Sequence, residues 1–226
     1  MIATGSDHGR PVESNIPPGF VRNRQPEDIP AIRALMARAY PHPHGPDAVW
    51  SEATLLAHLR VFPEGQLVAI TPEGSIVGSA SSLRIASERA LAPHTWSEIT
   101  GRGQLTTHDS TGEALYGVNI VVDPVCHGLG YGRLLYNARI RLARELGCKL
   151  IVAGARIPGY HKLADRMTLE DYVNAVTRSE IFDPTLSKQL KVGFQVQGVL
   201  RDYAPDPETL GHAALIVLPV EPEYAL

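Results

Sequence analysis

The sequence contains little of what a disulfide scaffold, a metal centre or a membrane span requires. It has only two cysteines, Cys126 and Cys148, which form no CxxC pair and belong to no set at metal-ligand spacing. So few thiols in a chain of this length favour a reducing compartment. No apolar run approaches the ~20 residues of a membrane-spanning helix, and the first residues lack the apolar core of a signal peptide. The sequence therefore predicts a cytoplasmic protein with no metal and no membrane contact.

The chain also carries little net charge. Its 21 Lys and Arg residues against 24 Asp and Glu residues give a net charge of -3 and a pI near 6.3. The basic residues are scattered, so the electrostatic footprint of a nucleic-acid-binding protein is missing. A hydrophobic content of 44% is enough to bury a core. We therefore expect a globular protein that has no nucleic-acid partner.

The order of the expected elements indicates an α/β protein. Hydrophobic periodicity predicts a strand, two helices, three strands, a helix, a strand, further helices and two last strands. The strands are expected at 19–24, 66–70, 75–85, 113–122, 149–153, 195–203 and 213–218, and the main helices at 30–40, 51–61, 131–146, 168 onward and 184–192. This order fits one mixed sheet of six to seven strands with helices on both faces. We expect residues 1–18 to be a flexible leader and 19–226 to be a single domain.

Three glycines at alternate positions join the fourth expected strand to a helix. The segment runs from Val121 to Arg133 and contains Gly128, Gly130 and Gly132. Glycines allow the backbone N–H groups to point inward, and no side chain blocks a ligand. The start of the helix adds unpaired N–H groups and a partial positive charge. This segment therefore predicts a site for a phosphate or pyrophosphate group.

Two common nucleotide motifs do not fit this segment. A dinucleotide-binding fold needs Gly-x-Gly-x-x-Gly and an acidic residue after the next strand. Here the spacing is Gly-x-Gly-x-Gly, and the next strand is followed by Gly154-Ala155-Arg156. A P-loop needs Gly-Lys-Ser/Thr, which is absent. A glycine-rich turn without any ligand stays open as the structural alternative.

The segment resembles the acetyl-CoA signature of the GNAT N-acetyltransferases, Gln/Arg-x-x-Gly-x-Gly/Ala. Gly130 and Gly132 match the two signature glycines, and His127 stands where Gln or Arg is usual. The resemblance extends to Glu27-Asp28-Ile29 and to Gly193-Phe194. It implies a GNAT-like acyl-CoA N-acyltransferase fold and direct transfer of an acetyl group from acetyl-CoA, as co-substrate and without a metal, to an amine. The cofactor residues that it implies are Val121, Val122, His127, Gly128, Leu129, Gly130, Tyr131, Gly132 and Arg133.

A narrower resemblance is to the acetyltransferase domains that accompany nitrilase-type carbon–nitrogen hydrolases. It is carried by Leu115-Tyr116-Gly117-Val118, Arg156-Ile157-Pro158-Gly159-Tyr160, Asp171-Tyr172-Val173, Asp183-Pro184 and Gly193-Phe194. Because the sequence ends at Leu226, we expect a stand-alone version or one that works with a separate hydrolase partner.

The sequence defines the catalytic groups less sharply. Many GNAT enzymes have a Tyr four residues before the late Gly-Phe glycine, where its hydroxyl protonates the leaving thiolate. This position is Gln189, whose amide cannot act as an acid. His108 and Asp109, before the fourth strand, are the acid and base candidates, and Tyr160 is a candidate proton donor. For each of them an exposed loop position or a packing role is the simpler interpretation.

Two functions of different class follow from this sequence. The first is an N-acetyltransferase whose acceptor is a small-molecule amine or a protein amine, and a homodimer is compatible with it. The second is a non-catalytic acyl-CoA-binding regulatory module. The long polar segment 86–112, together with 154–172, is predicted to set the acceptor, unless 86–112 is a tolerated insertion. Arg156, Tyr160, His161 and Asp165 suit a polar or anionic acceptor.

Overall fold

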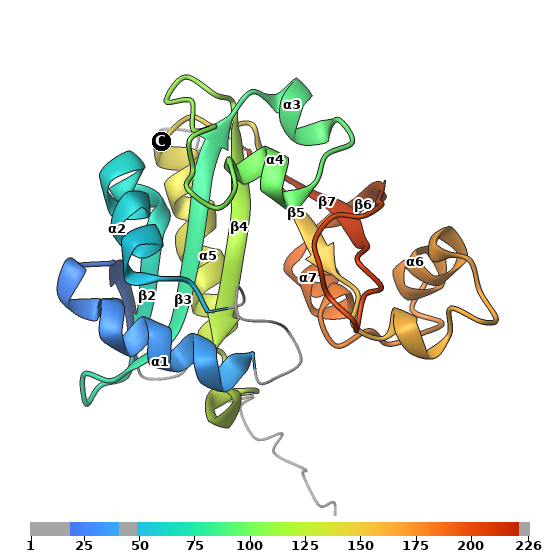
Figure 1. The fold of residues 1–226 in the computed structure, drawn as a ribbon, viewed down its shortest axis with the longest axis horizontal. Helices are drawn as coiled ribbons and strands as arrows, with labels where there is room; N and C mark the ends of the chain where they lie inside the picture. Colours follow the sequence, from blue (N-terminus) through green and yellow to red (C-terminus); the bar gives the residue numbers. More distant parts are fainter. Residues whose placement is uncertain (1–18, 41–48, 222–226) are drawn as a thin grey trace, which may run out of the picture.

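The computed structural model describes residues 19–40 and 49–221, which form one seven-stranded mixed sheet with helices on both faces (Figure 1). The strand order is β1-β2-β3-β4-β5-β7-β6. Only β4 and β5 are parallel neighbours; every other neighbouring pair is antiparallel. The predicted α/β class and mixed sheet are confirmed. The expected leader, residues 1–18, lies outside the described residues.

Most elements begin and end close to their predicted positions. The strands are β1 (Phe20–Asn23), β2 (Gln66–Ile70), β3 (Ile76–Ile85), β4 (Ala114–Val122), β5 (Leu150–Arg156), β6 (Gln195–Leu200) and β7 (Ala213–Pro219). The α-helices are α1 (Ile29–Ala39), α2 (Glu52–Val61), α3 (Ser87–Leu91), α4 (Trp96–Thr100), α5 (Tyr131–Glu145), α6 (Leu169–Thr177) and α7 (Leu186–Val192). Segment 86–112, expected to be irregular, therefore contains two short helices.

The end of β5 is the clearest error of the sequence-based prediction. The sequence predicts that the strand stops at Ala153 and that a loop begins at Gly154. Instead Gly154 and the two residues after it pair with β7. A Cβ atom at Gly154 would lie 2.3 Å from Cζ of Tyr203. The glycine therefore allows a tyrosine ring to pack directly on the strand.

The helices cover the two faces of the sheet in separate groups (Figure 1). On one face, α1 and α2 bury Ile32, Leu35 and Leu55 against the strands of the N-terminal half. On the opposite face, α5 buries Tyr131 and Leu135. Apolar residues at helical spacing thus fix each helix on its side and leave the ends of the strands for other contacts.

β4 and β5 separate in the middle of the sheet. Their parallel pairing begins at Ala114↔Leu150 and ends at Tyr116↔Val152. Beyond that point residues 117–122 of β4 have no strand partner on this side within the described chain, whereas β5 continues to pair with β7. The two halves of the sheet therefore diverge toward the end where β4 leads into the glycine turn (Figure 1).

Side chains from both faces hold this split open. On the α5 face, Arg139 is 3% exposed and its Nη2 donates to the Asn119 carbonyl (2.7 Å). On the other face, the Trp96 Nε1 donates to the Val118 carbonyl (3.2 Å). The Trp96 backbone N–H donates to the Tyr203 carbonyl (2.7 Å), which links this tryptophan to the other half of the sheet. Carbonyls that would have faced a neighbouring strand are thereby satisfied.

Candidate functional site

The glycine turn presents a row of unpaired backbone donors. Gly128 and Gly130 have φ angles of +81° and +91°, a region that favours glycine. The backbone N–H groups of Gly128 and of residues 130–133 donate to no backbone carbonyl in the part of the chain that the structure describes. They lie at the start of a fifteen-residue helix, whose dipole favours an anion. A pyrophosphate group fits this donor set.

The surface in front of these donors is open. A Cβ atom at Gly132 would meet only Cγ2 of Val122, at 3.8 Å, and one at Gly128 would meet nothing within 4 Å. Gly130 and Leu129 complete the outer edge of the turn, and Leu129 is 54% exposed. The space where a side chain would begin at Gly128 and Gly132 is therefore free for a phosphate that approaches the backbone.

His127 and Asp123 hold the base of the turn. Nε2 of His127 lies 3.1 Å from the Val122 carbonyl, so this nitrogen carries the proton and donates it. Oδ2 of Asp123 accepts from Nη2 of Arg38 (2.6 Å), and its Oδ1 accepts from the Val125 N–H (3.2 Å). The ring of His127 thus braces the end of β4, and the donors that face outward are those of the backbone after it.

Cys126 lies beside the turn without a feature that would activate it. Its side chain is half-buried, and burial and the nearby Asp123 raise the pKa of its thiol. A raised pKa keeps the thiol protonated, which opposes a role as nucleophile.

The structure does not bring His108 and Asp109 to this turn. Both precede β4, whose nine residues are separated by eight steps of about 3.3 Å and so span roughly 26 Å before the turn begins. Nδ1 of His108 accepts from the Arg84 N–H (3.1 Å), and its ring stacks on Phe62 at 4.5 Å. Oδ1 of Asp109 accepts from the N–H and hydroxyl of Thr111. These contacts shape the loop at the opposite end of the strand.

Tyr160, the third catalytic candidate, is a buried packing residue at 7% exposure. Its ring centroid lies 5.5 Å from that of Tyr172. The hydroxyl of Tyr172 donates to Oδ2 of Asp183 (2.8 Å), which also accepts from the Gly159 N–H (3.0 Å). Burial raises the pKa of Tyr172, and the bond to Asp183 adds to the shift. The contacts therefore fix the loop after β5.

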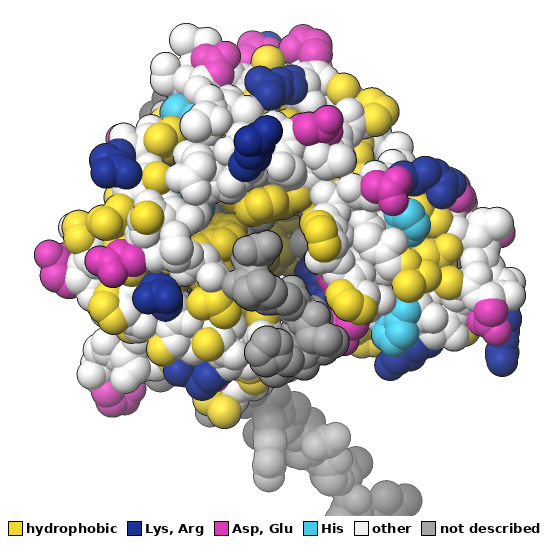
Figure 2. Space-filling view, in the orientation of Figure 1, with side chains coloured by type: hydrophobic (Ala, Val, Ile, Leu, Met, Phe, Trp, Pro, Cys, Tyr) yellow, Lys and Arg dark blue, Asp and Glu magenta, His cyan; other side chains and the backbone are white. Residues whose placement is uncertain are grey.

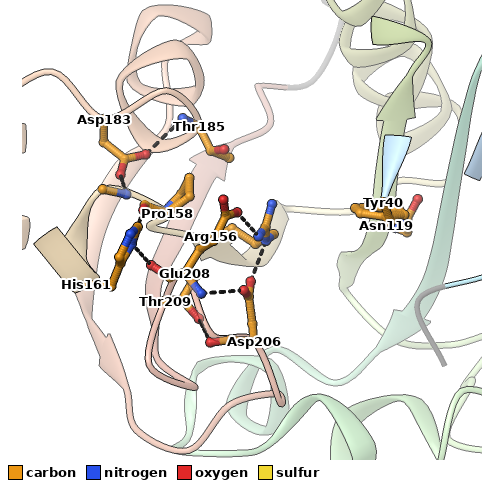
Figure 3. A network of polar contacts seen from close by, with 11 residues as sticks. Tyr40, Asn119, Arg156, Pro158, His161, Asp183, Thr185, Asp206, Glu208 and Thr209 are labelled. Atoms are coloured by element: carbon orange, nitrogen blue, oxygen red, sulfur yellow. Dashed lines mark hydrogen bonds and ion pairs between the residues drawn. The ribbon is translucent and has the colours of Figure 1, made fainter. Parts of the chain in front are cut away.

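A hollow lies on the α1–α2 face between the two halves of the sheet, and its visible lining is largely hydrophobic (Figure 2). On the β4 side, Nδ2 of Asn119 donates to the Tyr40 hydroxyl (3.1 Å). Figure 3 shows this pair facing a network on the other side, in which Arg156 donates to Asp206 (2.6 Å) and to Glu208 (2.9 Å). Because Arg156 is paired with two carboxylates, it does not supply the net positive charge that an anionic acceptor would need.

Gln189 lies on α7 and is 7% exposed. Its Nε2 donates to the Tyr136 hydroxyl (3.0 Å), while its Oε1 has no hydrogen-bond partner. Burial raises the pKa of Tyr136. The amide thus holds the hydroxyl of a facing helix at the position where the resemblance implies a tyrosine.

A chain of polar rings that runs from half-buried His94 into the core was not predicted from the sequence. Nδ1 of His94 lies 2.7 Å from the Ala92 carbonyl and therefore carries a proton, so Nε2 of the neutral ring accepts from the Tyr116 hydroxyl (2.8 Å). Tyr116 is in turn 2.9 Å from the Tyr203 hydroxyl. Burial lowers the pKa of His94, which favours the neutral ring. No local signal in the sequence pointed to it, because His94, Tyr116 and Tyr203 come from three separate segments.

Two features bear on cofactors and membranes. Within residues 19–40 and 49–221, no group of three or more His, Cys, Asp or Glu side chains is arranged to hold a metal ion. Among the same residues, no helix is long and apolar enough to cross a bilayer.

Comparisons with known proteins agree with this geometry. The sequence model of the acetyltransferase (GNAT) family matches residues 29–163. The "Uncharacterized N-acetyltransferase YkwB" of Bacillus subtilis (strain 168) is 33% identical over 196 residues, which cover 87% of this chain and 86% of that protein. The "Probable hydrolase YhcX" of the same organism is 42% identical over 186 residues, or 82% of this chain. The match spans only 35% of that longer protein.

Solved structures show the same fold. The "GphF GNAT-like decarboxylase in complex with isobutyryl-CoA" superposes with a TM-score of 0.75 at 28% identity, covering 89% of this chain and 99% of that one. The loading GNATL domain of CurA from Lyngbya majuscula, at 19% identity, has a TM-score of 0.76 over 89% of this chain and 98% of that one. The sheet that splits between β4 and β5, the glycine turn and these matches together show that the chain belongs to the GNAT acetyltransferase family.

Proposed function

We propose that this protein is an N-acetyltransferase that moves an acetyl group from acetyl-CoA to the amine of an acceptor. The observation that carries the proposal is the row of unpaired N–H groups at Gly128 and residues 130–133, placed where the free edge of β4 ends. These donors would hold the pyrophosphate of the cofactor. Residues 120–122 of β4, beyond the carbonyls that Trp96 and Arg139 satisfy, have no strand partner on this side within the described chain and would offer the pantetheine arm a strand edge to lie along.

In this arrangement the thioester lies in the split between β4 and β5, and the acceptor enters from the hollow on the α1–α2 face. Rate acceleration then comes from holding the amine against the thioester carbonyl and from removing a proton from the amine. Segment 86–112 is well placed to touch the acceptor, because Trp96 reaches the Val118 carbonyl at the split. Arg156 and its carboxylate partners line the opposite side.

The test is acetyl-CoA binding by calorimetry to the wild type and to Gly132→Glu. Because the space at Gly132 is open, the new side chain should leave the fold intact and place a carboxylate in the pyrophosphate site. We expect acetyl-CoA affinity to fall at least a hundredfold. Asn137→Glu, which adds the same charge to an exposed position of α5, is the matched control and should keep wild-type affinity.

Thiol release then separates catalysis from binding alone. With acetyl-CoA and a panel of amines, an N-acetyltransferase releases CoA thiol only when its acceptor is present. Binding of acetyl-CoA without thiol release for any small amine or peptide N-terminus would favour a regulatory acyl-CoA-binding module. Equal affinity of Gly132→Glu and wild type would refute the placement of the cofactor.

A second candidate is decarboxylation of a carboxylated acyl group on CoA. It is favoured by the 28% identity to the GphF GNAT-like decarboxylase over 99% of that chain. Malonyl-CoA without any amine separates the two: decarboxylation converts it into acetyl-CoA and CO₂, which mass spectrometry detects. Unchanged malonyl-CoA would leave amine acetylation as the function.

A further inference from the structure

Polar residues form a row across the sheet beneath α1 and α2. The Arg24 N–H donates to the Gln66 carbonyl (2.9 Å), which continues the β1–β2 ladder by one residue. Gln66 is opposite Ser81, and Ser81 is opposite Asn119. Residues directly opposite each other in antiparallel strands share a face. The row therefore runs from Arg24 to Asn119, which lies at the split.

Arg24 is a buried cation whose hydrogen-bonding capacity is only partly used. It is 2% exposed, and its Nη2 donates to the hydroxyls of Ser79 (2.9 Å) and Ser81 (3.0 Å). Its Nε and Nη1 have no hydrogen-bond partner, and it forms no ion pair with any described residue. The nearby Asp28 is bound by Arg22 instead (2.6 Å). Both serines are on β3, the strand next to β4, and neighbouring strands lie about 5 Å apart.

Burial lowers the pKa of Arg24 to about 10, an effect that the charge of Asp28 partly opposes. The side chain is therefore still charged near neutral pH. A buried charge with unpaired donors is unfavourable unless a partner of opposite charge completes it. Among the described residues, its side-chain partners are two neutral serines, and none of these residues forms an ion pair with it.

His58 and two tryptophans form a chain of ring contacts that reaches the split. His58 of α2 is fully buried, and its Nε2 donates to the Gly103 carbonyl (2.7 Å). Burial lowers the pKa of His58 to about 4, and the positive charge of Arg24 adds a smaller contribution in the same direction. The rings of Trp50 and His58 pack in a T-shaped arrangement, with their centroids 4.8 Å apart. Trp50 also stacks on Trp96, with a distance of 6.2 Å between the ring centroids. Trp96 in turn caps the Val118 carbonyl at the split.

We propose that Arg24, with Ser79 and Ser81, forms a subsite that binds a carboxylate group of one of the two substrates. The inference rests on the proposed function, because it takes the split as the place where the substrates meet. A carboxylate would accept a charge-assisted hydrogen bond from the guanidinium, which is about twice as strong as a neutral one. It would also supply the opposite charge that the described residues do not.

The carboxylate has two chemical sources. It belongs either to the acceptor, as in an amino acid, or to the acyl group on CoA, as in a malonyl-type thioester. The recognising chemistry is the same in both cases, so separate arms of one experiment distinguish them. The variants are Arg24→Met, which keeps side-chain length, and Arg33→Met as a control that removes an exposed arginine from α1.

The subsite itself is tested with acetate and its neutral isostere acetamide, added to the full-length protein saturated with CoA. The Nε–H resonance of Arg24 is assigned by NMR from its loss in Arg24→Met. We expect acetate to shift this resonance in a saturable way with a Kd near about 1 mM, typical of a four-atom fragment. Acetamide should cause no saturable shift, and Arg33→Met should behave as wild type. No saturable shift with acetate up to about 100 mM would overturn the proposal.

The source is tested by calorimetry with two pairs of ligands. One arm compares L-alanine with L-alaninamide on CoA-saturated protein, and the other compares malonyl-CoA with acetyl-CoA. In the arm that supplies the carboxylate, we expect the wild type to bind the acid at least tenfold tighter and Arg24→Met to lose this preference. An acid preference that Arg24→Met retains would overturn the proposal.

Two controls separate the possible failures. Arg24→Met should melt no lower than a few degrees below wild type, since only two serine hydroxyls lose their donor. It should also keep wild-type acetyl-CoA affinity, because the turn is unchanged. A wild type that binds no acetyl-CoA would refute the proposed function, whereas one that binds acetyl-CoA but shows no acetate response refutes only the subsite.

Discussion

Two buried arginines lie on opposite faces of the same strands, and they differ in what surrounds them. Arg139 of α5 donates to the carbonyls of Ser81 (3.1 Å) and Asn119 (2.7 Å) and to the Ser82 hydroxyl (3.0 Å). Arg24, on the α1–α2 face, donates only to two serine hydroxyls and leaves Nε and Nη1 unpaired. Both are at most 3% exposed. Burial alone therefore does not distinguish a structural arginine from a binding one; the state of its donors does.

The difference follows from the backbone beneath each side chain. Arg139 lies over the bulge between Ser81 and Ser82, where the register of β3 and β4 shifts. Irregular pairing leaves carbonyls that point out of the ladder, and the guanidinium satisfies them. Arg24 reaches Ser79 and Ser81 from the opposite face, where its partners among the described residues are side-chain hydroxyls and not backbone carbonyls. Arg139 therefore satisfies backbone carbonyls of the sheet, whereas Arg24 retains unpaired N–H donors that a ligand can use.

Loss of Arg139 is expected to have the largest effect on stability. Arg139→Met would leave the carbonyls of Ser81 and Asn119 without this donor and let the split relax. At about 1–3 kcal/mol for each buried polar group left unsatisfied, we expect a loss of about 3 kcal/mol or more in the free energy of unfolding. Urea denaturation measures it, with the exposed Arg141→Met on the same helix as control. A loss below about 1 kcal/mol in the free energy of unfolding would contradict the structural role that we assign to Arg139 and with it the contrast with Arg24.

His58, beside Arg24, should make stability depend on pH. Its folded pKa of about 4 lies below the ordinary value of 6.5, so the folded state binds fewer protons than the unfolded state between these values. This stability is complete above about pH 6.5 and is lost as the pH falls toward 4, by about 1.4 kcal/mol per pH unit and about 3 kcal/mol in total.

The measurement is urea denaturation from pH 7 to pH 4 on the wild type and on His58→Gln. Gln does not titrate and can keep the bond to the Gly103 carbonyl, so its stability should fall less over this range. Equal slopes for the two proteins would show that His58 is not held neutral by burial next to Arg24.

The contrast also shows which features sequence can predict. The glycine turn was predictable because its residues are neighbours in the chain and glycine spacing directly reflects backbone shape. Arg24 was not, because an arginine at the end of a short strand is normally exposed. Its burial depends on pairing with Gln66 and on reaching Ser79, residues more than 40 positions away.

The catalytic candidates failed to converge for a related reason. His108 and Asp109 precede the strand that leads to the turn, but the direction of β4 places them at its far end. Trp96 lies only twelve residues earlier and reaches the split, because segment 86–112 folds into two helices and returns over the sheet. The number of residues between a side chain and the site is therefore a poor guide to their distance in space where a loop folds back over the sheet.

Trp96 and Arg139 can be compared directly at the split. Trp96 satisfies one backbone carbonyl, whereas Arg139 satisfies two. Trp96→Phe would keep an aromatic ring beside Trp50 but remove the donor to the Val118 carbonyl. We expect a loss of about 1 kcal/mol, the usual net value of one hydrogen bond. Chemical denaturation of the variant tests this. A loss as large as that of Arg139→Met would mean that both faces hold the split equally.

Substitution of Gln189 is expected to have the smallest effect on stability. Its side chain is a useful test because it combines one polar atom that has a hydrogen-bond partner with one that has none within the described chain. Its Nε2 is bound to the Tyr136 hydroxyl, whereas its Oε1 is buried without a partner, like the free donors of Arg24. Gln189→Leu removes one hydrogen bond and one unsatisfied acceptor together, and these contributions offset each other. We expect the free energy of unfolding to change by less than about 1 kcal/mol and thiol release to stay within about threefold. If stability is unchanged but acetyl-CoA affinity falls tenfold or more in calorimetry, Oε1 accepts a hydrogen bond from the cofactor. The rule drawn from Arg24, that an unpaired buried group marks a place for a ligand, would then hold on α7 as well.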